Sequence, residues 1–270
     1  KERIMKVYIS ADLEGITGAT HWNEMDKKSS DYSEFKNRMT DEVVAACAGA
    51  FSAGATEIWV KDAHDSGRNI KADMLPENVK LIRGWSGHPY MMVQELNDSF
   101  DALLMVGYHA CAGSGGNPLA HTMSSSKIDT MTINDQSTSE FYLHGLVAAS
   151  LKVPLVFLSG DIDICKEVSE VNPHITTHAT MLGVGDSTIS MHPDESSKAI
   201  KGKVEKSLNG NLDYCILTVP ESFQVQVRYM KQVDAYRASH FPSSNLLDSK
   251  TVLFQCNDIM DVMTFVLFAV

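Results

Sequence analysis

The amino-acid sequence predicts an α/β fold with a mainly parallel sheet flanked by helices. Apolar runs of strand length alternate with segments of helical periodicity, which is typical of a parallel sheet covered by helices. The 270 residues are 44% hydrophobic and 21% charged, a globular composition. We expect residues 1–270 to form a single α/β domain, with room for a smaller C-terminal lobe from about residue 171, where the alternation becomes less regular.

The predicted strands, in chain order, are Lys6–Ala11, Glu57–Lys61, Ala102–Val106, Met131–Ile133, Pro154–Leu158, Tyr214–Thr218, Gln224–Arg228 and Thr251–Phe254. The predicted helices are Tyr32–Ala53, Met91–Leu96, Glu140–Leu151, Ile162–Glu170, Ser196–Leu208 and Asp258–Phe268. The first helix has the clearest pattern, because Val43, Cys47 and Phe51 recur at helical spacing and Gly54 follows as a stop signal.

Charge and cysteine content exclude several classes of protein. The net charge is −11 and no basic stripe occurs, so we expect neither nucleic acid nor a membrane surface as a partner. No run approaches the ~20 apolar residues of a membrane span, and the amino-terminal segment is not typical of a signal peptide. The five cysteines are widely spaced without a CxxC pair, which favours free thiols and a cytoplasmic location.

Acidic residues and histidines follow the predicted strands. Ligands of open α/β sheets bind beyond the carboxyl ends of the strands, so we expect these side chains to share one site. Carboxylate and imidazole together suit zinc or a similar divalent ion. The residues, strand by strand, are Asp12 and Glu14, then Asp62, His64 and Asp65, then His109, then Asn134, Asp135 and Glu140, and finally Asp161.

The first of these groups has the spacing of a shared metal site. Alternate residues of a strand point to the same side, so Asp12 and Glu14 can face one site, and Gly15 would let the chain turn away. A carboxylate can bridge two cations, as in hydrolases whose paired ions lie ~3.5–4 Å apart. The alternative is that both acids cap the next element.

Each remaining candidate also has a structural explanation. His64 lies in a polar turn and can be solvated, whereas His109 directly follows an apolar run and would need buried partners. The stretch STSE, Ser137 to Glu140, can form a capping box with Glu140 at the third helical position. Asp161 can cap a helix.

A glycine-rich stretch, AGSGGN, leads to His121. The stretch lacks the GK[ST] ending of a phosphate loop and is typical of a mobile surface loop. A loop that can close over a metal site is a suitable carrier for a catalytic acid or base. His144 is a weaker ligand candidate on the face of Glu140, and Cys111 is better explained as a small residue in the loop than as a nucleophile.

Six stretches together resemble the zinc-dependent D-aminopeptidases of the DppA type. The resemblance spans roughly residues 6 to 165, and no single stretch would be specific. The stretches are YISADLEGITG, WVKDAHDSGRNI, LMVGYHACAG, AHTMSSS, TINDQSTSE and VFLSGD.

The resemblance implies two Zn²⁺ ions per subunit. Asp12 would bridge them, Glu14 and His64 would complete one ion, and His109 and Glu140 the other. His121 matches the position of the family's catalytic nucleophile or base. The family forms homo-decameric rings and removes D-amino acids, notably D-Ala, from the amino end of short peptides.

Metal-assisted peptide hydrolysis is therefore the predicted reaction, since zinc lowers the pKa of a bound water to ~7. Asp62 and Asn134 would orient ligands or form turns. A dinuclear-metal phosphoesterase is the alternative enzyme. It would need cationic side chains to bind the phosphate oxygens, and only Arg68 and Lys127 are candidates near the site. A non-catalytic metal-binding assembly protein is the third hypothesis.

Overall fold

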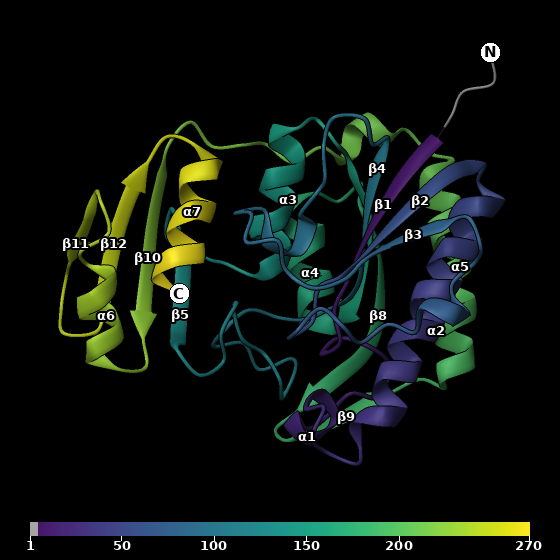
Figure 1. The fold of residues 1–270 in the computed structure, drawn as a ribbon, viewed down its shortest axis with the longest axis horizontal. Helices are drawn as coiled ribbons and strands as arrows, with labels where there is room; N and C mark the ends of the chain where they lie inside the picture. The colour runs from purple at the N-terminus through teal and green to yellow at the C-terminus, as the bar shows by residue number, and fades with distance from the viewer. Residues whose placement is uncertain (1–4) are drawn as a thin grey trace.

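A seven-stranded sheet forms the centre of the computed structural model, which describes residues 5–270 (Figure 1). All neighbouring pairs in it are parallel except β8 with β9, which confirms the predicted mainly parallel α/β fold. Its strands, in spatial order, are β3 (Val79–Ile82), β2 (Ala55–Asp62), β1 (Met5–Ala11), β4 (Ala102–Tyr108), β7 (Leu155–Asp161), β8 (Thr176–Val184) and β9 (Ser187–Ser190).

Helices cover both faces of this sheet. The pair α2 (Tyr32–Ser52) and α5 (Pro193–Leu208) lies on one face, while α3 (Glu140–Ser150) and α4 (Ile162–Val171) lie on the other (Figure 1). The predicted end of the first long helix is confirmed, since Gly54 follows α2 with a φ of +95°, a conformation that favours glycine.

A second, antiparallel sheet lies beside the first, with α7 between it and α3 (Figure 1). Two of its strands come from the middle of the chain and three from the end. They are β11 (Ser244–Leu246), β12 (Thr251–Cys256), β10 (Phe223–Tyr229), β5 (Ile128–Ile133) and β6 (Gln136–Ser137), in spatial order. Two helices accompany this sheet: α6 (Gln232–Ala238) and α7 (Ile259–Ala269).

The second sheet changes the expected place of one predicted strand. The predicted strand Met131–Ile133 is part of β5, so it does not end at the edge of the parallel sheet with the other strands. Beyond residue 171, β8 and β9 extend the first sheet, and α5 packs against it. The division of residues 1–270 into one domain with a C-terminal lobe stays a prediction.

Two shorter predictions were wrong. The predicted strand Tyr214–Thr218 overlaps the 3₁₀ turn η3 (Leu212–Cys215) and has no strand pairing. The predicted helix Met91–Leu96 is only the short 3₁₀ turn η2 (Met91–Val93), because Met91 and Glu95 adopt left-handed φ of 41° and 70°, which an α-helix over these six residues does not accommodate.

The remaining short elements are α1 (Trp22–Met25) and η1 (Ala72–Met74). Within residues 5–270, no helix has the length and apolar character needed to cross a membrane. The buried apolar side chains form one continuous core between the sheets and helices.

Candidate metal centre

Three neighbouring strands deliver polar side chains to one edge of the parallel sheet. The last residue of β1 pairs with the last residue of β2 and with Val106 of β4. Asp12, His64 and His109 follow these strands within three residues, so the strand register brings them together. All three are buried, with at most 5% of their surface exposed.

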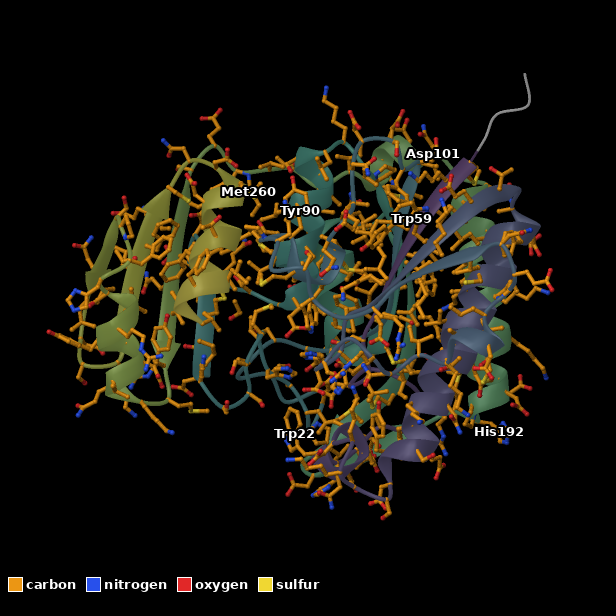
Figure 2. The ribbon with its side chains drawn as sticks, in the orientation of Figure 1. Trp22, Trp59, Tyr90, Asp101, His192 and Met260 are labelled. Carbon is orange, nitrogen blue, oxygen red and sulfur yellow. The ribbon has the colours of Figure 1, made fainter. Side chains whose placement is uncertain are left out.

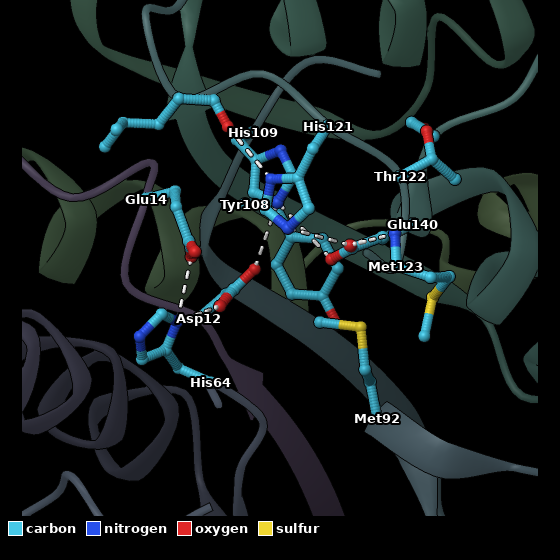
Figure 3. Close-up of polar contacts among 12 residues, drawn as sticks. Asp12, Glu14, His64, Met92, Tyr108, His109, His121, Thr122, Met123 and Glu140 are labelled. Carbon is cyan, nitrogen blue, oxygen red and sulfur yellow. Dashed lines mark hydrogen bonds and ion pairs between the residues drawn. The ribbon is translucent and has the colours of Figure 1, made fainter. Parts of the chain in front are cut away.

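The side chains of these three residues, together with those of Glu14 and Glu140, form a continuous series of short contacts (Figure 3). His64 Nδ1 lies 3.0 Å from Glu14 Oε2 and 3.4 Å from Asp12 Oδ1. On the other side, His109 Nε2 lies 3.5 Å from Asp12 Oδ2 and 3.4 Å from Glu140 Oε2. Asp12 is therefore the centre of the group, with one imidazole near each of its two oxygens.

The chain after β1 can reach this position because Gly15 is a glycine. Its N–H donates to Gly107 O at 2.8 Å, and an added Cβ would lie 1.7 Å from Tyr108 O. Gly15 lies in a turn, as expected, and its lack of a side chain also allows the close backbone approach between the ends of β1 and β4.

Glu140 arrives from a helix rather than from a strand. It is the first residue of α3, and Ser139 is the N-cap, accepting a hydrogen bond from Tyr142 N at 3.2 Å. The capping box predicted from Ser137 is therefore wrong. The Glu140 carboxylate instead accepts the Met123 N–H at 2.7 Å, and Met123 adopts a left-handed φ of 61° that aims this group.

His121 lies beside the same group (Figure 3). Its ring stacks on that of His109, with centroids 4.2 Å apart, and its Nε2 is 3.6 Å from Glu140 Oε1. Its Nδ1 is 2.9 Å from Leu119 O, which orients the ring. A cavity of about 510 Å³ borders His121 and the carboxylates, so substrate can reach them.

The donor set fits a divalent cation. His109 Nε2 is buried and, within residues 5–270, has no hydrogen-bond partner although it faces two carboxylates. Among residues 5–270, the carboxylates of Asp12, Glu14 and Glu140 form ion pairs with histidines only, and none with lysine or arginine. Buried carboxylates this close together need a compensating positive charge.

Two overlapping groups have donor atoms within 4.8 Å of one another. One is Asp12, Glu14 and His109, and the other is His109, His121 and Glu140. Mixed nitrogen and oxygen donors of this kind suit zinc.

Burial and mutual charge shift the pKa values of the group in opposite directions. Burial and the charge of Glu14 raise the pKa of Asp12 well above its usual range. Burial acts upward on Glu140 too, but the neighbouring His109 outweighs it and lowers that pKa to about 2. Burial and His109 lower the pKa of His121, which favours the neutral imidazole that can accept a proton.

Comparison with known proteins decides the family. The model of the D-aminopeptidase family matches residues 5–268, almost the entire chain. The chain belongs to the D-aminopeptidase family. The resemblance, the metal-dependent aminopeptidase function and the hydrolase class expected from the sequence are confirmed at this level.

Two comparisons cover nearly all of this D-aminopeptidase. A D-aminopeptidase of Bacillus subtilis (strain 168) is 29% identical over 259 residues, which are 95% of this chain and 93% of the relative. The solved structure of the Zn-dependent D-aminopeptidase DppA from Bacillus subtilis, described as a self-compartmentalizing protease, aligns with a TM-score of 0.92 at 28% identity. The alignment covers 98% of this chain and 96% of that chain.

Other predicted residues lie outside the metal centre of the D-aminopeptidase. Asn134 and Asp135 are exposed beside the second sheet, where Asn134 bonds to Gln224 N and Ser222 O. His144 is buried but bonds to backbone groups, its Nδ1 lying 2.7 Å from Glu140 O. Asn134 and Asp135 follow a strand of the antiparallel sheet rather than of the parallel one. The side chain of His144 faces backbone groups instead of the other metal-ligand candidates.

Asp62 and Asp161 organise the loops of the site. Asp62 accepts hydrogen bonds from Asn69 and from Ile70 N, which shapes the turn that carries His64. Asp161 is the expected N-cap of α4, and its second oxygen accepts from Ala110 N at 2.7 Å.

Sequence reasoning missed the role of Asn117, at the end of the glycine-rich stretch. Its Nδ2 donates to Asp161 Oδ2 at 3.1 Å and to Glu14 O at 3.0 Å. Gly183 N also donates to Gly116 O, so the end of the expected mobile loop is attached to the sheet. The only signal in the sequence was that Asn117 follows a cluster of glycines, and such a position does not predict a buried side-chain amide.

Neither alternative chemistry gains support from the cavity. Arg68 and Lys127, the residues considered for binding phosphate, do not line it, and Lys127 bonds to Val270 O. Cys111 lines a different cavity, and burial raises the pKa of its thiol to about 11, which disfavours a thiolate.

Proposed function

We propose that this D-aminopeptidase binds two zinc ions, bridged by Asp12. One observation carries the proposal: the two oxygens of Asp12 face different imidazoles, with Oδ1 3.4 Å from His64 Nδ1 and Oδ2 3.5 Å from His109 Nε2. A carboxylate with one imidazole nitrogen beside each of its two oxygens has the arrangement of a ligand that bridges two metal ions.

Glu14 and His64 would complete one ion, and His109 and Glu140 the other. The mixed donor set supports zinc, as does the likeness to DppA, which is described as Zn-dependent. Bound zinc ions supply Lewis acidity, which activates water at neutral pH and polarises the scissile carbonyl.

The chain's own groups hold the substrate and move the proton. His121 lines the cavity, and its Nε2 would take up or deliver the proton as water adds to the carbonyl and the peptide nitrogen leaves. Leu119 O keeps the ring in place through Nδ1, so that Nε2 stays available. The substrates would be short peptides with an amino-terminal D-residue, such as D-Ala.

The decisive experiment combines metal analysis with peptide hydrolysis. Protein treated with chelator and reloaded with zinc should hold two ions per chain and cleave a D-Ala dipeptide in preference to the L-Ala dipeptide. His121→Ala should keep both ions while kcat falls by roughly 10²–10⁴, the contribution of general acid–base catalysis. His240→Ala is the matched control, because His240 is exposed beside the second sheet and should have no effect.

Each part of the proposal can fail separately. One zinc ion per chain would refute the bridging role of Asp12. Full turnover in His121→Ala would refute its catalytic role, and cleavage of a chromogenic phosphate ester without peptide cleavage would favour the phosphoesterase.

We also propose that the chain forms a homo-oligomer, specifically the decameric ring expected from the resemblance. The relative DppA is described as self-compartmentalizing, and the edge hairpin β8–β9 of this chain exposes apolar side chains that a second copy could cover. They are Leu182, Val184, Ile189 and Met191. Light scattering coupled to size-exclusion chromatography tests the mass, and a monomer would contradict the proposal.

The cytoplasmic location stays a proposal as well. All five cysteines are free, as in proteins of reducing compartments.

A further inference from the structure

The wall of the cavity contains an exposed but fixed tryptophan. Trp85 follows β3 and lines the cavity with 42% of its surface exposed. Its indole Nε1 donates to Asp65 O at 2.7 Å. Lys61 Nζ lies 3.9 Å from the ring centroid and also donates to Gly84 O at 2.6 Å, next to Trp85 in the chain.

These contacts make Trp85 a preorganised surface. An exposed aromatic side chain loses conformational entropy when it becomes ordered on binding, but here a hydrogen bond and a cation–π contact already hold the ring. A rigid aromatic that costs little to order is typical of a residue that anchors a ligand.

Trp85 belongs to one end of the site. It bonds to the residue after His64, the ligand on the Glu14 side of Asp12. Trp22, at the start of α1 (Figure 2), lies beside His121 instead, with its ring edge-on to the imidazole and the centroids 5.5 Å apart. If His121 acts where the peptide nitrogen leaves, the leaving part of the substrate lies toward Trp22 and the amino-terminal residue toward Trp85.

The composition of the cavity favours a bulky apolar side chain over a small or acidic one. Its volume of about 510 Å³ falls in the range of pockets that enclose drug-sized ligands, and it extends from the metal-centre candidates to Trp85. Three methionines add adaptable apolar surface. No lysine or arginine is among the described lining residues, whereas the exposed carboxylates of Asp26 and Asp65 are. The methionines are Met25, Met92 and Met123.

We propose that Trp85 is a specificity-determining residue that packs against an aromatic side chain of the amino-terminal D-residue. The preferred substrates would be peptides that begin with a residue such as D-Phe, ahead of D-Ala and well ahead of D-Glu. This inference rests on the proposed function, because it uses the position of the bound peptide between the metal ligands and His121.

Steady-state kinetics of the zinc-loaded enzyme on three tripeptides test the proposal. We expect kcat/KM for D-Phe-Gly-Gly to exceed that for D-Ala-Gly-Gly by roughly tenfold, the value of one good aromatic contact, and D-Glu-Gly-Gly to be the poorest. Trp85→Ala should reduce the D-Phe to D-Ala ratio to near one, while Trp85→Phe should keep most of it. Lys61→Met should reduce the ratio in part, because the Trp85 ring then lacks the cation–π contact that helps to hold it in place.

Tyr236→Ala is the control, since Tyr236 is an exposed aromatic of α6 away from the cavity and should leave the ratio unchanged. Zinc content and circular dichroism of each variant report whether the site is still folded. Efficient cleavage of D-Ala-Gly-Gly with a ratio that Trp85→Ala does not alter would refute this inference and leave the proposed function intact. Absence of cleavage of all three peptides by zinc-loaded protein would refute the proposed function, and this inference with it.

Discussion

Replacing Glu42 with glutamine should make the stability of the protein less dependent on pH. Glu42 lies on α2, is only 2% exposed, and its Oε1 accepts hydrogen bonds from Thr17 N at 2.9 Å and Thr17 Oγ1 at 2.6 Å. Its other oxygen has no hydrogen-bond partner among residues 5–270. Burial raises the pKa of this carboxyl to about 7, against 4.5 for the ordinary group.

The sign and size of the effect follow from this shift. Between about pH 4.5 and 7, the folded protein keeps the proton that the unfolded chain has lost, so the free energy of unfolding falls as the pH rises. At 1.36 kcal/mol per pKa unit, the loss across this window is roughly 3 kcal/mol, and it is complete above pH 7. Glutamine resembles the protonated carboxyl and does not titrate.

Urea unfolding of wild type and Glu42→Gln, measured at several pH values on metal-free protein, tests the reasoning. The two free energies of unfolding should agree near pH 4.5, and the variant should be more stable by roughly 3 kcal/mol at pH 8. Glu77→Gln, at an exposed position before β3, should follow wild type at every pH. Parallel curves for wild type and Glu42→Gln would refute the argument.

Two further substitutions test the loops around the metal centre. Asp161→Asn replaces one of two acceptor oxygens by an NH₂ donor, so the bonds from Ala110 N and Asn117 Nδ2 and the cap of α4 cannot all be kept. Zinc affinity in a chelator competition should therefore fall by about 10–100-fold, the usual cost of losing a group that supports ligands. Asp163→Asn, two residues further along, should bind zinc normally, and equal affinity for both variants would contradict the role of Asp161. Gly15→Ala places Cβ 1.7 Å from a backbone oxygen and should lower the free energy of unfolding by more than about 2 kcal/mol. A wild-type urea midpoint would show that the backbone can move aside.

Metal-centre candidates on adjacent parallel strands could be predicted because local sequence fixes where a strand ends. The apolar runs before Asp12, His64 and His109 are strands β1, β2 and β4, and parallel strands end at a common edge. The alternation of strands and helices predicted the parallel sheet for the same reason, because the spacing of apolar residues that distinguishes a strand from a helix depends only on neighbouring residues.

The sequence predicts Glu140 in the site for a partly wrong reason. The strand before it, β5, belongs to the antiparallel sheet, and Glu140 reaches the site as the first residue of α3. Four residues with capping character, Ser137 to Glu140, allowed more than one helix start, and the sequence could not choose between them. In the folded chain Ser139 is the N-cap, Glu140 contacts Met123, and α3 packs against the parallel sheet.

The sequence by itself predicted the strands β1, β2 and β4 that precede the site, the chemical types of the metal-centre candidates, and the family to which the chain belongs. The tertiary structure alone decided which oxygen of Asp12 faces which imidazole, how Asn117 and Asp161 connect two loops, and that Trp85 lines the same cavity. The reason is physical: hydrophobic periodicity and capping are properties of neighbouring residues, whereas contacts between residues 50 or 103 positions apart, such as His64 with Glu14 and Asn117 with Glu14, depend on strand order and loop packing.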